Sequence, residues 1–149
     1  PGASTWGENG HLAAWLDPSN AWIYPQLSVA AQKMINQARK FADEIVGQPR
    51  KHSGLPNEPS AGEAPALQLT DRVLKQLARE LLLAQSSDWA FLMKTGSARE
   101  YATQRTIDHL ARFSRLHDQL VTDNLDEEFL RDCEWRDNIF PNVNWRYYA

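Results

Sequence analysis

The sequence predicts an all-α fold, a bundle of about four helices with an irregular, aromatic-rich N-terminal segment and an irregular C-terminal tail. Apolar residues recur every three or four positions along several stretches, which is the period of amphipathic helices. Hydrophobic residues make up 42% and charged residues 23% of the chain, as in proteins that bury an ordinary globular core. The length of 149 residues suits one domain, residues 1–149.

Residues 1–20 are expected to form an irregular loop segment, because Gly, Ser, Asn and Pro are frequent there. The run Asp-Pro-Ser-Asn at 17–20 predicts a turn, since Pro fixes φ and the short polar side chains bond to the local backbone. A first helix is expected from about residue 21 to residue 47. Its apolar stripe, spaced by four and three residues, consists of Leu27, Ala31, Met34, Ala38, Phe41 and Ile45.

Residues 47–65 hold four of the eight prolines and three of the seven glycines. We interpret this stretch as a mobile surface loop between two packed helices rather than as a domain boundary. A second helix is expected from residue 66 or 67 to residue 85, with a stripe so wide that Leu81 and Leu82 are both predicted to be buried. The polar run 86–88 offers capping side chains before a fresh helical turn at Trp89, and Gly96 ends that turn.

A third helix is predicted to begin with a capping box, in which Ser97 and Glu100 each bond the other's backbone amide. It is expected to end near residue 121, and its core-facing residues are Tyr101, Leu110, Phe113, Leu116 and Leu120. A shorter fourth helix is expected after residue 124 or 126 and runs to about residue 135. Its inward-facing residues are Phe129, Leu130 and Cys133.

The charge balance and the hydropathy pattern exclude several classes of protein. Sixteen Lys and Arg residues against nineteen Asp and Glu residues give a net charge of -3, whereas nucleic-acid-binding proteins normally carry a basic excess or stripe. No apolar run approaches the roughly 18 residues of a membrane span, and no signal segment opens the chain. We therefore expect no nucleic-acid or membrane partner and a cytoplasmic location. The chain begins at Pro1 without a Met, and we expect it to be part of a longer polypeptide.

The groups that often carry catalysis or bind metals are predicted to be structural here. Cys133 is the single cysteine, so no internal disulfide forms and a small buried thiol is expected. The acidic runs at 126–128 and 132–134 predict a solvated helix face. Two neighbouring pairs are expected to be solvated surface pairs, His109 with Asp108 and His117 with Asp118. We expect no catalytic residue, no metal ligand and no organic cofactor in this chain.

Tryptophan is the unusual component of the sequence, with six in 149 residues. Trp6 and Trp15 lie in non-periodic sequence, where they either stack on the apolar faces of sugar rings or plug the end of the bundle. Asp88 is open to two interpretations, as the N-cap of a helix or as a carboxylate at the lip of a cleft. The tryptophans expected to pack in the core or to close the bundle are Trp22, Trp135 and Trp145.

Three separated segments resemble one known family. Residues 78–91, which end in Ser-Ser-Asp-Trp-Ala-Phe, resemble the last sequence block of the family 57 glycoside hydrolases, in the form carried by their α-1,4-glucan branching enzymes. Ser-Thr-Trp-Gly-Glu at 4–8, with Trp-Leu at 15–16, is similar to the segment that enters their C-terminal helical domain. Residues 137–142, with Trp-Arg at 145–146, are similar to their chain end. The resemblance covers essentially the whole chain, and residues 47–65 are its least similar part.

The resemblance implies a function that needs a second domain. In this family a distorted (β/α) barrel carries a Glu nucleophile and an Asp acid/base, and a retaining mechanism cleaves α-1,4 links and forms the α-1,6 branches of glycogen- or starch-type polysaccharides. Both catalytic residues belong to sequence blocks that this chain lacks, so no residue here is expected to be catalytic. The helical domain packs on the barrel and lines the α-glucan cleft. By position, Trp6 and Trp15 are expected to stack on glucose rings, Asp88 to bond sugar hydroxyls and Trp89 to border the cleft.

The implied partners are therefore an amylose-like α-glucan and the catalytic barrel of the same parent protein. Whether the parent branches glucans, transfers 4-α-glucan segments or hydrolyses them stays open from the sequence. An alternative of a different class also stays open, namely a non-catalytic helical module whose apolar, aromatic face binds a protein partner. This alternative predicts a large exposed apolar patch and no affinity for glucans.

Overall fold

The computed structural model describes residues 12–47 and 63–149, and all regular structure within these ranges is helical. Five α-helices follow one another: α1 (Ile23–Gly47), α2 (Glu63–Ala84), α3 (Ser87–Thr95), α4 (Arg99–Val121) and α5 (Glu127–Arg136). The short 3-10 turns η2 (Leu12–Ala14) and η3 (Trp145–Tyr148) flank them. The all-α prediction is confirmed, and the fresh turn expected at Trp89 is the separate helix α3. Most of the predicted loop at 47–65 lies outside the described residues, although its last three residues already belong to α2.

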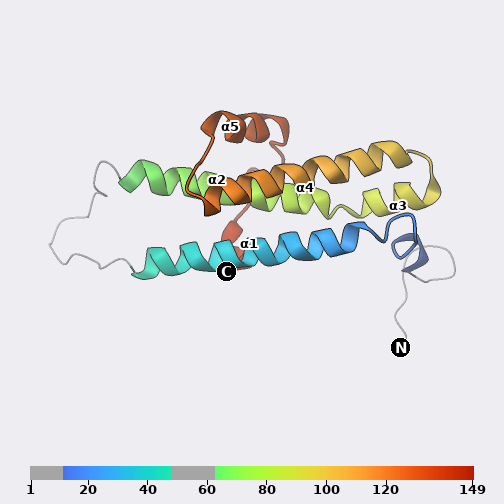
Figure 1. Ribbon diagram of the computed structural model, residues 1–149, viewed down its shortest axis with the longest axis horizontal. Coiled ribbons are helices and arrows are strands. Elements are labelled where there is room, and N and C mark those ends of the chain that lie inside the picture. The colour runs from blue at the N-terminus through green and yellow to red at the C-terminus, as the bar shows by residue number, and fades with distance from the viewer. Residues whose placement is uncertain (1–11, 48–62) are drawn as a thin grey trace.

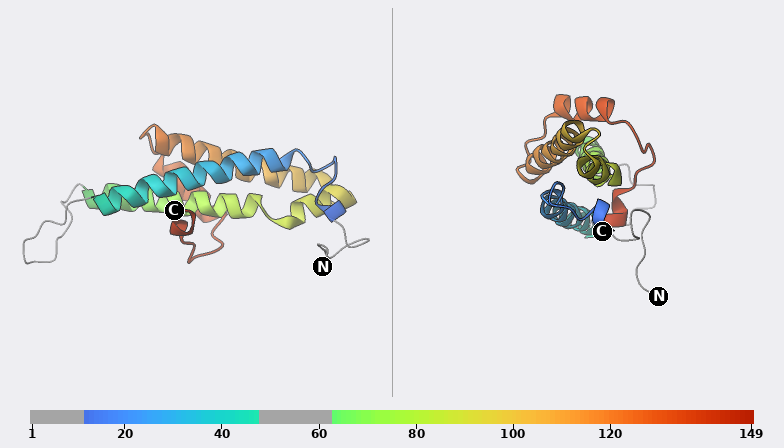
Figure 2. Two further views of the ribbon diagram at one scale, coloured as in Figure 1. Left: turned by 90° about the horizontal axis from the view of Figure 1, so that it is seen from below. Right: turned by 90° about the vertical axis from the view of Figure 1, so that its right-hand side faces the viewer.

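The three long helices α1, α2 and α4 lie side by side along the long axis of the molecule (Figure 1). α5 covers one side of the α2–α4 pair and α1 covers the other, so the helices form three layers (Figure 2). The tail after α5 returns past α2 and ends with η3 against α1. α3 and η2 are in contact at one end of the bundle. None of the described helices is long and apolar enough to cross a membrane.

The periodic apolar stripes form one core between these layers. Its largest members on the three long helices are Met34, Phe41, Leu74, Leu77, Leu81, Phe113 and Leu116. Each buried side chain of this size contributes about 1.5–3 kcal/mol of transfer free energy. Leu130 and Cys133 of α5 belong to the same core, as predicted for the inner face of the fourth helix. The apolar stripes therefore hold α5 as well as the three long helices.

Three residues of the predicted helical stripes are exposed rather than buried. Ile45 lines a surface hollow near the end of α1, and Leu82 lines another between α2 and the tail. Tyr101 meets the ring of Trp89 edge-on, with 6.1 Å between centroids, and is otherwise open to solvent. A helical stripe shows which residues share a face, but the neighbouring helices decide how much of that face is covered.

Trp145 in the tail is fully buried, as predicted. Its indole Nε1 donates a hydrogen bond to Asp71 at 2.8 Å, and its ring centroid lies 5.4 Å from that of Phe41. A large aromatic side chain with a satisfied N–H group stabilises a core strongly. Trp145 therefore anchors the tail between α1 and α2.

The core role expected for Trp22 and Trp135 is wrong. Trp135 is 77% exposed, because Leu130 and Cys133 define the buried face of α5 and position 135 lies about 140° or more around the helix from both. Trp22 precedes the first turn of α1 and is 36% exposed. Both side chains contribute to the surface rather than to closure of the bundle.

The helix ends differ in part from the expected capping pattern. The predicted capping box at Ser97 is wrong, since α4 begins at Arg99 after Ala98 and the Ser97 hydroxyl contacts that of Thr95 at 3.1 Å instead. Gly96 ends α3 with a φ of 75°, which a residue without Cβ adopts without strain. Asp126 is the N-cap of α5, and its carboxylate accepts a hydrogen bond from the Phe129 amide at 3.0 Å.

Candidate functional site

Two of the four predicted glucan-binding residues pack against the same apolar cluster at the η2–α3 end of the bundle. Trp15 follows η2 and Trp89 lies in the first turn of α3, and both pack against one small apolar cluster formed by Ile23, Ala90, Met93 and Ala102. Trp6 lies outside the described residues. Asp88 directly precedes Trp89 and is exposed. Because η2 and α3 are in contact, the fold brings Trp15, Asp88 and Trp89 to the same end of the bundle, the end where Figure 1 shows α3.

The Trp15 ring is half-buried and fixed by its surroundings. The backbone carbonyl of Trp15 accepts a hydrogen bond from the hydroxyl of Tyr24, and burial raises the pKa of that hydroxyl. Its indole Nε1 is buried and has no hydrogen-bond partner among the described residues. Because this N–H group is turned away from solvent, the chemistry that Trp15 offers a ligand is the face of its ring.

Asn20, which the sequence analysis did not single out as a site residue, fastens the Trp15 segment to α3. Its fully buried amide donates to the carbonyls of Ala14 and Ala90, both at 3.0 Å. Next to it, Asp17 pairs with Lys94 at 2.5 Å. The hydrogen bonds from Lys94 and Ser19 hold the pKa of Asp17 well below its usual range. The turn at 17–20 was predicted, but its contacts with α3 depend on residues 70 or more positions away.

Asp88 and Trp89 have different roles at this corner. Asp88 lies in the first turn of α3, so the N-cap interpretation is wrong, and the N-cap position belongs to Ser86. The closest hydrogen-bond partner of its carboxylate is the Ser86 hydroxyl, at a long 3.4 Å. Trp89 instead donates from Nε1 to the Leu83 carbonyl at 2.6 Å and holds the α2–α3 junction. Asp88 therefore has capacity to bond a ligand, whereas Trp89 can offer only its ring.

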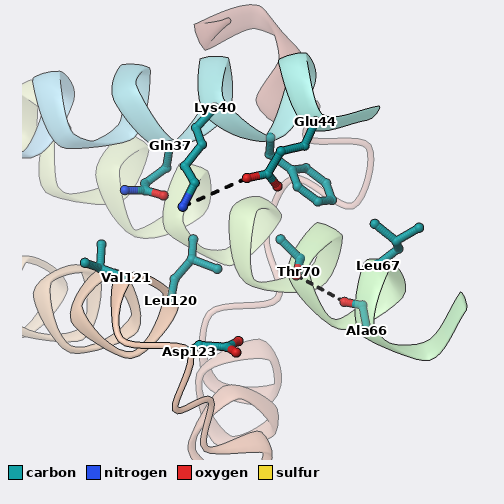
Figure 3. Close-up of a pocket in the computed structure, with 10 residues that line it drawn as sticks. Gln37, Lys40, Glu44, Ala66, Leu67, Thr70, Leu120, Val121 and Asp123 are labelled. Atoms are coloured by element: carbon teal, nitrogen blue, oxygen red, sulfur yellow. Dashed lines mark hydrogen bonds and ion pairs between the residues drawn. The ribbon is translucent and has the colours of Figure 1, made fainter. Parts of the chain in front are cut away.

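A hollow of about 380 Å³ lies elsewhere, between α1, α2 and the end of α4. Figure 3 shows Lys40 and Glu44 of α1 pointing toward each other above it, and their charged groups are 3.9 Å apart. Leu120 and Val121 line its α4 side. Phe41 also lines it and is almost fully buried. Its described lining therefore exposes no broad aromatic face on which a sugar could stack.

A buried polar network joins α2, α4 and the end of α5. His109 Nδ1 lies 2.7 Å from Glu80 Oε2, and Arg105 donates to His109 Nε2 at 3.0 Å. Since an arginine only donates, Nε2 is the acceptor and Nδ1 carries the proton that is donated to Glu80. Asp137, the C-cap of α5, is held by Arg112 at 3.0 Å. The prediction that His109 forms a surface pair with Asp108 is wrong, because the nearest carboxylate partner lies 29 residues away on another helix.

The electrostatics of this network favour a structural role. One ligand atom each from Glu80, His109 and Asp137 lies within 4.8 Å of the other two, which is compatible with a metal ion. However, both imidazole nitrogens are already engaged, and Arg105 and Arg112 supply positive charge next to Asp137. Burial raises the pKa of Glu80. The donor set is complete without a cation, and the residues present do not fit a metal centre.

Three further predictions have mixed outcomes. Cys133 is fully buried as expected, and burial raises the pKa of its thiol to about 12. His117 does approach Asp118 at 3.1 Å, but its ring is mostly buried and stacks on Phe113 rather than being solvated. The acidic face of α5 is only partly solvated, since Glu134 accepts two hydrogen bonds from Arg72, at 3.1 and 2.7 Å.

With this geometry in hand, comparison with known proteins identifies the family. The family model described as 1,4-alpha-glucan branching enzyme, C-terminal, matches residues 58–148. The chain belongs to this family. It is 32% identical, over 93% of its length, to a 1,4-alpha-glucan branching enzyme of Thermococcus kodakarensis, of which it covers 18%.

Solved structures agree with membership of the branching-enzyme C-terminal family. A GH57-type branching enzyme of Pyrococcus horikoshii matches 97% of this chain with a TM-score of 0.72 and 34% identity, and the match covers 24% of that protein. An alpha-amylase of Thermotoga maritima matches 89% of the chain with a TM-score of 0.66 and 40% identity, and the match covers 22% of it. The chain thus spans about a fifth to a quarter of the length of these relatives.

Proposed function

We propose that this chain forms one wall of the α-glucan cleft of a branching enzyme, packed on a catalytic (β/α) barrel that it does not contain. In this proposal Trp6 and Trp15 stack on glucose rings, Asp88 bonds sugar hydroxyls and Trp89 borders the cleft. One observation carries the proposal: in a branching-enzyme C-terminal domain, Trp15 and Trp89 pack on one cluster at the same end as an exposed Asp88 carboxylate.

The chemistry of this corner suits a sugar polymer. Aromatic rings offer flat apolar faces, and an exposed carboxylate accepts hydrogen bonds from hydroxyl groups. In the parent enzyme we expect a retaining double displacement, in which a glucan cut at an α-1,4 link is passed from the barrel's nucleophile to a 6-hydroxyl group, as in glycogen- or starch-type synthesis. The residues of this chain take part only by binding and positioning the glucan. The cytoplasmic location expected from the sequence stays part of the proposal.

The experiment uses the full-length protein that contains this chain. Asp88→Ala is expected to lower branching of amylose-like chains about tenfold, the effect of one lost hydrogen bond to substrate. Trp6→Ala is expected to have a similar effect through lost stacking. The matched controls are Glu128→Ala, an exposed acid in the first turn of α5, and Trp135→Ala on the same helix. Normal kinetics for Asp88→Ala and Trp6→Ala, at unchanged thermal stability, would remove these residues from the cleft.

A helical protein-interaction module is the second candidate, favoured by the exposed ring of Trp135 on α5. It predicts that Trp135→Ala abolishes capture of a protein partner and that the glucan assays do not respond to Asp88→Ala. The two candidates therefore make opposite predictions for the same pair of variants.

A further inference from the structure

A hollow of about 640 Å³, here called the tail hollow, opens between Leu82 of α2 and the tail residues 140–148. Its volume lies within the roughly 300–1,000 Å³ of small-molecule sites. It does not include Trp15, Asp88 or Trp89. The tail hollow is therefore separate from the proposed glucan-binding site at the η2–α3 end, and substitutions can test the two sites independently.

Two aromatic side chains stand exposed at this hollow. Tyr147 is 88% exposed and Phe140 is 43% exposed. Phe140 has a φ of 56°, a left-handed conformation that is strained for a bulky residue. Such strain persists only where the surrounding structure imposes it, and it is concentrated at functional sites. The strained backbone conformation of Phe140 therefore holds an apolar ring at the surface.

The surrounding structure that imposes this conformation is well defined. Arg79 donates to the Ile139 carbonyl at 3.0 Å, immediately before Phe140, and the Val143 amide donates to the Phe140 carbonyl at 3.0 Å. Trp145, anchored by Asp71, fixes the chain on the far side of the hollow. The two exposed rings are thus carried by a rigid segment, which lowers the entropic cost of binding.

The polar groups that line the tail hollow are uncharged, and several of them are free to form further hydrogen bonds. Its lining contains no Asp, Glu, Lys, Arg or His. Within the described part of the chain, the side-chain amide of Asn142 and the hydroxyl of Tyr147 make no hydrogen bond. The side chain of Asn144 uses only its Oδ1 atom, which accepts a hydrogen bond from the backbone N–H of Arg146 at 3.1 Å. A phosphate, a nucleotide or a metal ion would find no opposite charge here. A neutral polyol finds both apolar ring faces and free amide and hydroxyl groups.

We propose that the tail hollow is a second glucan-binding site, which takes a neutral α-1,4-glucan segment by stacking on Phe140 and Tyr147 and by hydrogen bonds to Asn142 and Asn144. That the bound polyol is a glucan rests on the proposed function. The existence of the site is inferred from the volume and the lining residues of the tail hollow. Its role is to hold a distant part of a long polymer while another part occupies the cleft.

The test is a titration of the 149-residue chain with maltoheptaose. Binding is measured by calorimetry and by the NMR signals of the Asn142 and Asn144 side-chain amides. Tyr147→Ala and Phe140→Gly each remove one ring, and glycine adopts the positive φ at position 140 without strain. We expect each variant to weaken binding about tenfold, the effect of one lost aromatic contact. Trp135→Ala removes an aromatic ring on α5 that is 77% exposed, and this variant is expected to bind as the wild type does.

The outcomes separate this inference from the proposed function. Shifts of the Asn142 and Asn144 signals that Tyr147→Ala abolishes support the second site, even if the Trp89 indole signal stays unchanged and the cleft assignment fails. Shifts confined to Trp89, or no shift at about 10 mM maltoheptaose, overturn the second site. Self-association of the chain that Tyr147→Ala abolishes, without any response to maltoheptaose, also overturns it and assigns the hollow to protein contact.

Discussion

Replacement of His109 by leucine tests whether the buried polar network holds α5 and the tail on the bundle. The imidazole and the Glu80 carboxylate are both fully buried. The variant removes the 2.7 Å bond to Glu80 and the 3.0 Å bond from Arg105, and it leaves Glu80 with the Gln76 amide at 2.9 Å as its remaining partner. Removing one partner of a buried hydrogen bond, so that the other group loses its partner in dry surroundings, costs about 1–3 kcal/mol. We expect the free energy of unfolding of His109→Leu to fall by this amount.

A double variant separates loss of the network from loss of packing. Glu80→Met combined with His109→Leu removes both buried polar groups and keeps the volume nearly constant, so its loss should be smaller than that of His109→Leu alone. His117→Leu is the matched control on the same helix, because its polar partner Asp118 is exposed. We expect this control to change the free energy of unfolding by less than about 1 kcal/mol.

Urea unfolding followed by far-ultraviolet circular dichroism measures these differences, since α-helices dominate the described structure. The comparison is valid where the dependence on urea has the same slope in all variants. A loss below about 1 kcal/mol in His109→Leu would refute the reasoning. A double variant whose loss equals the sum of the two single losses would refute it as well, because residues in one network do not behave additively.

Three further predictions concern a helix end and two buried ionisable groups. Gly96→Ala should lower the free energy of unfolding by about 1 kcal/mol, because alanine is strained at a φ of 75°; thermal denaturation checks this, and an unchanged stability contradicts it. Burial raises the pKa of Glu80 above 4.5, so its contribution to stability is present below that value and is lost as the pH rises through the raised pKa. Unfolding from about pH 4 to pH 8 should therefore show the wild type losing stability relative to Glu80→Gln, and parallel curves would contradict it. The Cys133 thiol, with its pKa raised to about 12 by burial, should react with an alkylating reagent at about pH 8 only after unfolding, and rapid reaction of the folded chain would contradict its burial.

Much of the helical architecture was predictable, because helix formation depends on neighbours three and four positions away. The apolar stripe through Met34, Ala38 and Phe41 lies on the buried face of α1, as its spacing indicates. Where several helix starts were possible, the outcome was less predictable. Ser97 had a suitable spacing to Glu100 for a capping box, yet α4 begins two residues later. The contact between Ser97 and Thr95, on the other side of the Gly96 turn, replaces the predicted cap.

The candidate site was predictable only in part. Trp15 was singled out from its non-periodic surroundings and from the family resemblance, and Trp89 from the resemblance alone; the fold places both on one apolar cluster. No pattern in the sequence indicated that Asn20 joins their two segments, because its amide bonds to a carbonyl 70 residues away. The tail hollow was missed for the same reason, because Leu82 and Tyr147 line one hollow only after the tail has returned across α2.

The sequence by itself determined the all-α class, the approximate helix ranges and the family, since these depend on local periodicity and on motifs that keep their order along the chain. Tertiary structure decided which side of each helix is covered, and so moved His109 into the interior and Trp135 onto the surface. The physical reason is that burial depends on every element that packs against a residue. His109 follows Asp108 in sequence but bonds to Glu80, because both side chains are buried and a buried polar group without a partner costs free energy.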